Sequence, residues 1–177
     1  MGRKRSVFAF FRAALLAALS VAVWSGPVRA DDALASLRSD FQRQTDPVKR
    51  AKQFPKLGSA LLAQMRKLIQ EREFDHVPTL LTEYRDGAAA AFTGLEASGR
   101  DAGKNSAGYR ELEIHLRHSL HVVNDVIFAL PVDERDQLRG TQRELEQLDQ
   151  KLVKALFPTK PEGAKTPPSS FAPHPER

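Results

Sequence analysis

The sequence predicts an all-α protein, a four- to five-helix bundle built from two antiparallel helical hairpins. One observation is that apolar residues recur every three or four positions along most of the chain, which is the spacing of a helix with one buried face. A second is that a proline separates the two clearest segments, and the link is too short for anything but antiparallel neighbours. We expect helices over 31–44, 47–73, 75–97, 108–130 and 133–157.

The last two helices carry the clearest pattern. In 108–130, six apolar residues fall within a band roughly 80° wide around the helix axis. They are Leu112, Leu116, Leu120, Val123, Ile127 and Leu130. Pro131 ends this helix, because proline has no N–H to donate to the preceding turn. Asp133 is expected to cap 133–157, which ends at Phe157-Pro158.

These two helices need a further layer to be stable. Each buried Leu, Ile or Val contributes about 1.5–3 kcal/mol, whereas ordering costs about 1–2 kcal/mol per residue in backbone entropy alone. Gly140 weakens the last helix by about 1 kcal/mol relative to alanine. The segments 31–44, 47–73 and 75–97 are therefore expected to pack against this hairpin.

The first hairpin is bounded by caps and prolines. Asp46-Pro47 predicts a helix start, with aspartate as the cap and proline in the first turn. Pro55 is expected to kink or split 47–73 near Phe54, and Gly58 to loosen it further. Asp75 is expected to cap 75–97, in which Pro78 is tolerated because first-turn N–H groups have no partner within the helix.

Residues 1–30 are typical of a bacterial secretory signal peptide. A basic start is followed by a short apolar core over 13–24 and by Val28-Arg29-Ala30, an imperfect small-x-Ala cleavage site. Arg12 interrupts the run that would otherwise approach the roughly 20 apolar residues of a membrane span. We expect a protein of the periplasm or the medium with no membrane span after cleavage; a retained signal anchor is the alternative.

Charge and cysteine content exclude several classes of protein. Removal of 1–30 takes five of the 27 basic residues and no acidic residue, which leaves 22 basic against 22 acidic residues. A nucleic-acid partner is not expected, because the phosphate-binding excess of charge leaves with the signal. The absence of cysteine excludes disulfides, a lipid anchor and covalently attached haem.

Residues 159–177 are predicted to be a disordered tail. This segment is rich in proline, poor in apolar groups and without periodicity. The expected organisation is thus a signal peptide over 1–30, one helical domain over 31–158 and this tail. A proline-rich ligand for a partner is the alternative role of the tail, although it lacks a clear docking motif.

Two resemblances accompany this pattern. The first is to a single tetratricopeptide-type hairpin, and it is carried by Lys56-Leu57-Gly58, Phe74-Asp75 and the spacing from Leu80-Leu81 to Tyr84. This resemblance implies protein binding, and it makes a right-handed helical stack the competing fold. More broadly, residues 46–158 resemble secreted all-helical bacterial proteins of unassigned function, which implies export and helices but no activity. The segments that carry this resemblance are Phe54-Pro55-Lys56-Leu57-Gly58, Tyr84-Arg85-Asp86-Gly87, Ala97-Ser98-Gly99-Arg100-Asp101 and Glu111-Leu112-Glu113-Ile114.

One cluster of polar residues is a candidate metal site. Glu111, His115, His118, His121 and Asp125 follow one another at three or four positions, on the side of the helix opposite the leucine stripe. Adjacent members could share a zinc, copper or nickel ion, although one helix face offers only two ligands comfortably. The alternative is that these are solvent-facing polar residues, or that His118 and His121 pack against the connector over 98–107.

No residues are arranged for catalysis. The sequence has no phosphate-cradling glycine loop, no cysteine nucleophile and no serine in a nucleophile elbow. Met65 with a histidine could ligate haem, but it lies on the Leu61–Leu68 stripe and is better explained as core. We therefore expect an exported non-catalytic protein without a cofactor, which binds an unknown protein partner through a groove between helices or its tail. Divalent metal binding by the histidine face is the alternative function.

Overall fold

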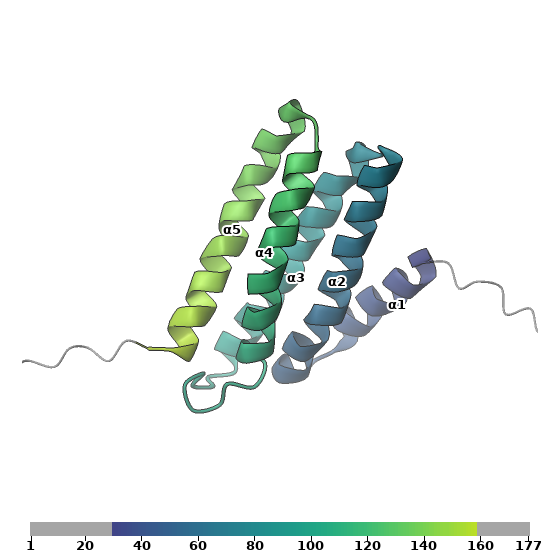
Figure 1. Cartoon of the computed structure of the whole chain (residues 1–177). Coiled ribbons are helices and arrows are strands. Elements are labelled where there is room, and N and C mark those ends of the chain that lie inside the picture. Colours follow the sequence, from purple (N-terminus) through teal and green to yellow (C-terminus); the bar gives the residue numbers. More distant parts are fainter. Residues whose placement is uncertain (1–29, 159–177) are drawn as a thin grey trace, which may run out of the picture. The chain divides into compact units, whose positions relative to one another are not determined.

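The computed structural model of the protein describes residues 30–158, which form five α-helices and one short 3₁₀ turn (Figure 1). All five predicted helices are confirmed, each within two residues of its expected ends. Their bounds are α1 Ala30–Arg43, α2 Pro47–Glu71, α3 Val77–Ala97, α4 Tyr109–Ala129 and α5 Val132–Leu156, with the turn η1 at Phe74–His76.

The chain divides into two units, Met1–Ala33 and Leu34–Arg177. Of the first unit only 30–33, the first turn of α1, lies in the described range. The predicted signal peptide, and with it the question of a retained anchor, therefore falls almost wholly outside the described residues. The predicted tail 159–177 lies outside them as well.

From Leu34 onward the protein is a helical bundle, as predicted. Each of the four long helices contacts two neighbours in a ring, in the order α2, α3, α5, α4 and back to α2, and α3 and α4 also touch across it. The four run side by side in Figure 1. This closed ring is the arrangement of a four-helix bundle, in which every apolar stripe faces one shared core, rather than of an open stack of hairpins.

The remaining part of α1 packs against the outside of α2 and α3. The ring of Phe41 lies 6.0 Å from that of Phe54, and the guanidinium of Arg50 lies 4.8 Å over Phe41. Arg38 donates two hydrogen bonds of 2.6 Å to the carboxylate of Glu83. The helix is thus attached through both apolar and charged side chains.

The core contains the residues that the sequence pattern placed there. The α4 stripe is buried except for Leu120, which is half-buried. Met65 is fully buried among the apolar residues of α2, so its core assignment is confirmed. The largest fully buried side chains include Tyr84, Phe54, Leu61, Leu81, Leu95, Leu112, Leu116, Leu145 and Leu152.

The predicted caps are correct in one case and wrong in two. Asp46 caps α2 by accepting a hydrogen bond of 2.8 Å from the N–H of Lys49, and Pro47 occupies the first turn. Asp75 is not a cap, because it lies inside η1 and His76 precedes the first residue of α3. Asp133 is not a cap either: α5 begins one residue earlier, directly after Pro131, and Asp133 lies in its first turn near the positive end of the helix.

Pro55 does not split α2, which is a correction to the sequence analysis. The helix is continuous from Pro47 to Glu71. Proline removes one backbone hydrogen bond, but the adjacent Phe54 is fully buried and its ring lies 5.3 Å from that of Tyr84. Packing on α3 therefore keeps the helix intact at a residue that would break it in isolation.

Gly58 lies at a close contact of α2 with its neighbours, a role that the sequence does not indicate. A Cβ atom at Gly58 would lie 2.5 Å from Nε2 of His115 and 2.9 Å from Cε2 of Tyr84. The missing side chain thus lets α4 approach α2 closely.

Within the described residues, no helix is long and apolar enough to cross a bilayer.

Candidate functional site

The five residues of the predicted metal cluster do not converge. Glu111 turns back to the start of α4, where its Oε2 accepts a hydrogen bond of 2.7 Å from the N–H of Gly108. Its Oε1 lies 3.4 Å from Nζ of Lys52 on α2. The carboxylate therefore satisfies an orphan N–H of the helix start and pairs with a neighbouring helix.

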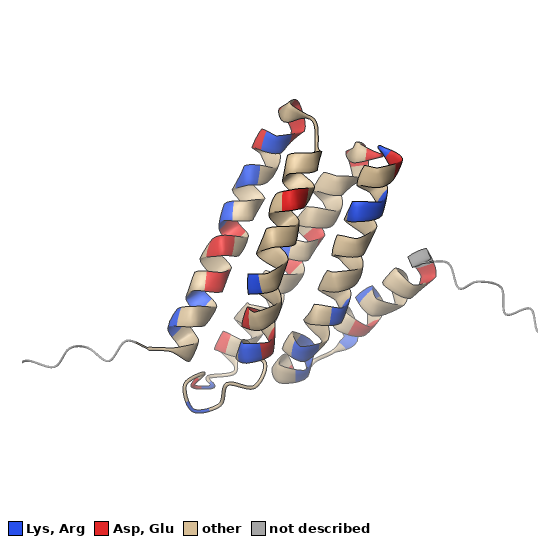
Figure 2. Ribbon diagram, viewed as in Figure 1, with Lys and Arg blue, Asp and Glu red and all other residues tan. Residues whose placement is uncertain are grey.

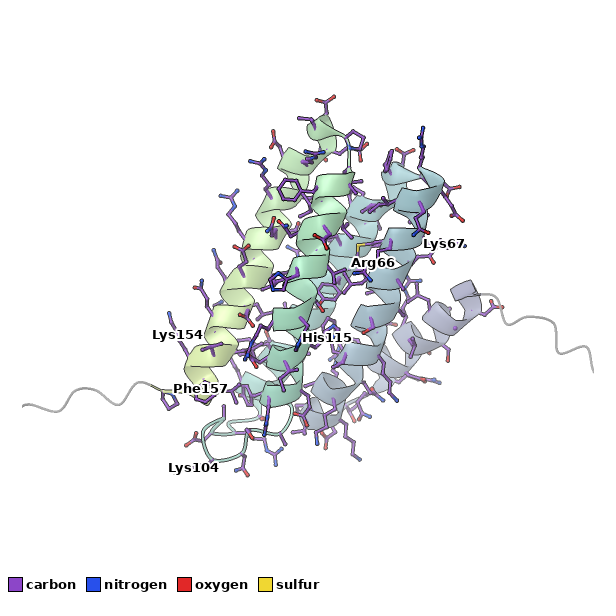
Figure 3. The ribbon with its side chains drawn as sticks, viewed as in Figure 1. Arg66, Lys67, Lys104, His115, Lys154 and Phe157 are labelled. Carbon is purple, nitrogen blue, oxygen red and sulfur yellow. The ribbon has the colours of Figure 1, made fainter. Side chains whose placement is uncertain are left out.

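His115 points into the bundle (Figure 3). Its ring packs edge-on against Phe54, with centroids 5.5 Å apart and planes at 84°, and lies 6.0 Å from the ring of Tyr84. Burial, with a smaller effect of the charge on His118, lowers the pKa of His115 to about 4. His115 is therefore neutral at physiological pH and held by aromatic neighbours.

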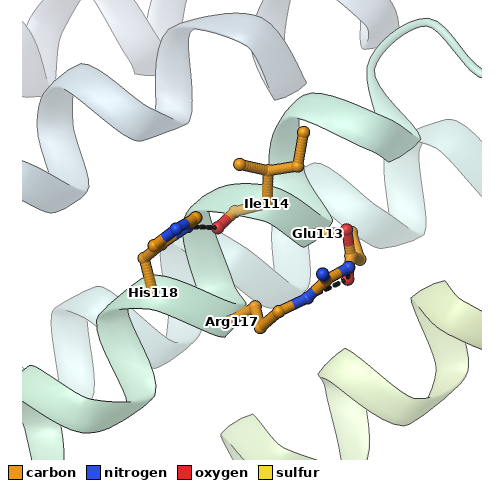
Figure 4. Close-up of polar contacts among 4 residues, drawn as sticks. All are labelled: Glu113, Ile114, Arg117 and His118. Carbon is orange, nitrogen blue, oxygen red and sulfur yellow. Dashed lines mark hydrogen bonds and ion pairs between the residues drawn. The ribbon is translucent and has the colours of Figure 1, made fainter.

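His118, His121 and Asp125 are exposed on the surface of α4. Nδ1 of His118 lies 2.6 Å from the carbonyl oxygen of Ile114 (Figure 4). Because a carbonyl only accepts, this contact places the proton on Nδ1. No three His, Asp or Glu residues in the described part of the chain are placed to share a metal ion.

A buried polar group that the sequence analysis missed lies beside His115. Tyr84 is fully buried, and burial raises the pKa of its hydroxyl well above the usual range. The hydroxyl of Ser119, also buried, lies 3.4 Å from Nε2 of His115. Tyr84 was read as part of an apolar stripe because its position on α3 has helical spacing, and spacing alone does not report the phenol oxygen.

The exposed apolar side chains of the described residues gather on one hairpin. Every large apolar residue that is substantially exposed belongs to α4, to α5 or to the residue that ends α5. These residues are Ile114, Phe128, Val132, Val153 and Phe157. Phe128 and Val132 are 63% and 68% exposed, on either side of the turn between the helices. Single exposed apolar residues are ordinary, but their restriction to one hairpin marks this face.

A hollow of about 520 Å³ lies at one end of this face. The connector after α3, the first turns of α4 and the end of α5 line it, with Arg110, Arg117 and Glu113 as its charged residues and Ile114 and Phe157 among its apolar ones. Phe157 marks this end in Figure 3.

Glu113 is the buried charge of this hollow. It is 2% exposed, and Nε of Arg117 one turn later donates a hydrogen bond of 2.8 Å to its Oε1 (Figure 4). Across the interface, burial and the charge of Glu113 raise the pKa of Asp149 on α5, while Arg117 opposes that shift. Arg117 thus compensates two carboxylates between α4 and α5.

A second hollow of about 460 Å³ lies toward the other end, between the last turns of α4 and the first half of α5. Arg135, Arg139 and Arg143 line it along α5, with Phe128 from α4 and one acidic residue, Glu146. Figure 2 shows basic residues recurring along α5. The four-residue spacing of these arginines is visible in the sequence and could have identified the stripe, but the α4 wall of the hollow could not be inferred without the fold.

The site is therefore a surface with two open hollows, the second of them rich in arginine, and with exposed apolar residues along it. Its elements are the two helices whose pattern was clearest in the sequence. Comparison of the chain with protein-family models, with curated proteins and with solved structures found no match in any of the three.

Proposed function

We propose that the protein is an exported, non-catalytic helical module of the bacterial cell envelope that binds a protein partner through the α4–α5 face. The observation that carries this proposal is the gathering of the exposed large apolar residues of the described chain on this one hairpin. Two hollows lie along the same face, so a partner would find both apolar anchors and polar contacts there.

The positions of the titratable residues support binding rather than catalysis. The two groups with the largest pKa shifts, Tyr84 and His115, pack against aromatic rings in the bundle core. Shifted pKa values at an active site accompany access to a substrate, whereas here burial in the core accounts for them. Their role in this proposal is to fix the packing of α2, α3 and α4.

The test is capture of partners from envelope extract by the wild-type protein and by Phe128→Asp and Val132→Asp variants. Each variant places a charge at an exposed apolar anchor, and we expect affinity for a captured partner to fall by at least about tenfold. The matched control is Ala63→Asp, which adds the same charge on the exposed side of α2. Equal capture by all four proteins would contradict the proposal.

The alternative function is divalent metal binding by His118 and His121. Its support is the contact between His118 Nδ1 and the Ile114 carbonyl, because such a bond leaves Nε2 as the metal-binding nitrogen and fixes the ring. Both histidines are exposed and lie three positions apart on α4, a spacing at which two ligands reach one ion.

A further inference from the structure

We propose that the second hollow, here called the arginine groove and lined by Phe128, Arg135, Arg139, Arg143 and Glu146, binds an acidic amphipathic helix of the partner protein. Its carboxylates would pair with Arg139 and Arg143, and one apolar side chain would pack on Phe128. This inference rests on the proposed function and specifies the chemistry of the partner.

The charge of the groove favours an acidic ligand. Three arginines line it against one glutamate, Glu146, which accepts a hydrogen bond of 3.1 Å from Nε2 of Gln142 and keeps its negative charge. An acidic segment lying here would therefore meet an excess of positive charge, which steers association and selects against basic partners.

Arg135 organises the apolar end of the groove. Its Nε and Nη2 donate hydrogen bonds of 2.8 and 2.7 Å to the carbonyl oxygens of Leu130 and Phe128, which are left without helical partners at the end of α4. Its guanidinium also lies 5.8 Å from the centroid of the Phe128 ring. Phe128 is thus kept next to the arginines while remaining 63% exposed, as an anchor for a partner side chain.

Arg139 and Arg143 are the two arginines available to a ligand. Nε of Arg139 lies 3.5 Å from Oδ1 of Asp136, an exposed pairing within the same helix that an incoming carboxylate can replace. Nε of Arg143 donates to the carbonyl oxygen of Arg139 at 3.2 Å, which holds the guanidinium along α5. The two residues lie one turn apart, a rise of about 6 Å.

A helix matches this spacing. Glutamates at positions i and i+4 of a partner helix also repeat at about 6 Å, so two carboxylates can face two arginines at once. A helix that carries an apolar residue on the same face would place it toward Phe128 when it lies along the groove between α4 and α5. This is the helix-in-groove mode of recognition.

The distribution of acidic residues argues for a peptide rather than an anionic membrane. Asp125, Asp133 and Asp136 are exposed near the turn that carries Phe128 and Val132. A flat anionic bilayer that reached these apolar residues would also meet the three carboxylates. A helix lying along α5 meets the arginines as well, and Asp136, which pairs with Arg139, is the carboxylate that it would have to displace.

The test uses the full chain and a fluorescein-labelled synthetic peptide, an alanine-rich helix of about five turns with glutamate at every fourth position and one leucine on the same face. A second peptide carries glutamine in place of each glutamate. In anisotropy titrations we expect the glutamate peptide to bind at least about tenfold more tightly than the glutamine peptide, with the difference shrinking as salt is raised.

The variant Arg139→Glu/Arg143→Glu should weaken binding of the glutamate peptide by about tenfold or more, because two attractions become repulsions. Arg66→Glu/Lys67→Glu is the matched control, since both residues are exposed on α2, which does not contact α5 (Figure 3). A peptide with lysine in place of glutamate should bind the double variant and not the wild type, an exchange that a folding defect would not produce.

The outcomes separate this inference from the proposed function. Unchanged peptide binding by the double variant would overturn the inference. So would binding to vesicles of phosphatidylglycerol without binding to the glutamate peptide. If the peptide fails to bind while Phe128→Asp still abolishes capture from the extract, the α4–α5 face remains the binding surface and only the acidic-helix assignment falls.

Discussion

At the scale of single residues, His115 departs most from its sequence interpretation. The alternation of polar residues on α4 placed it on the polar side of the helix with the other histidines. In the structure its ring packs against both Phe54 and Tyr84, because Gly58 on α2 leaves space for it. The absence of a side chain at Gly58 on α2, and not any property of α4 itself, therefore decides the environment of His115.

This burial predicts a pH dependence of stability. The pKa of His115 is about 4 in the folded protein against 6.5 in the unfolded chain, so the unfolded state binds the proton more readily. The contribution is fully present above pH 6.5 and is lost as pH falls through about 4. Allowing for partial solvent screening, we expect a loss of about 2 kcal/mol in the free energy of unfolding over this window.

The measurement is urea denaturation of the wild type and of His115→Gln between pH 7 and pH 4. In the glutamine variant the free energy of unfolding should no longer show this fall with pH. In His121→Gln, a change at an exposed position of the same helix, the fall should remain. Identical slopes for the wild type and His115→Gln would show that His115 does not titrate as its environment requires.

At the scale of elements, two glycines in helices have opposite roles. Gly58 lies where α2 meets α4, and an added Cβ would be 2.5 Å from Nε2 of His115. Gly140 lies in α5, and an added Cβ would meet nothing within 4 Å. From sequence both were read as weak points of helices. Only the packing of neighbouring helices shows that the contact of α2 with α4 requires glycine at position 58, whereas nothing in the packing requires it at position 140.

We expect Gly58→Ala to lower the free energy of unfolding by about 1–3 kcal/mol, since α2 and α4 must move apart or His115 must leave its place. Gly140→Ala should raise it by about 1 kcal/mol through helix propensity alone. Thermal and denaturant unfolding of the two variants against the wild type checks both signs. A stabilising Gly58→Ala would contradict the close approach described above.

At the scale of the whole molecule, one hairpin serves the core and a surface at once. The α4 stripe and Leu138, Leu145, Leu148 and Leu152 of α5 face the bundle, while Phe128 and Val132 face solvent. The stability of this arrangement comes from apolar burial shared by four helices. The bundle core therefore does not require a ligand on the outer surface of α4 for its stability.

The bundle is therefore expected to keep its unfolding temperature when Zn²⁺, Cu²⁺ or Ni²⁺ is added to the protein. A ligand stabilises only through preferential binding to the folded state, and two exposed histidines offer few ligands for that. Differential scanning against this metal panel is the measurement. A rise in unfolding temperature that His118→Ala/His121→Ala removes would support the alternative, metal-binding function.

The helices and the arginines of the α4–α5 face could be predicted from the sequence, but its role as a binding surface could not. The helix ends and the arginine spacing on α5 are local properties, and both are visible in the chain. The caps assigned to Asp75 and Asp133 failed because proline and a short 3₁₀ turn shift a helix start by a residue or two. The metal cluster was drawn from one helix in isolation, and partners from α2 redirect Glu111 and His115.

The sequence by itself determined the helical class, the number of helices and the residues of the apolar stripes. These follow from periodicity and from proline, which act within one segment. Only the tertiary structure decided that α2 stays whole at Pro55, that Gly58 admits His115, and that the exposed apolar residues share one face with two hollows. The physical reason is that each of these depends on side chains from helices distant in the chain, which meet only when the bundle closes.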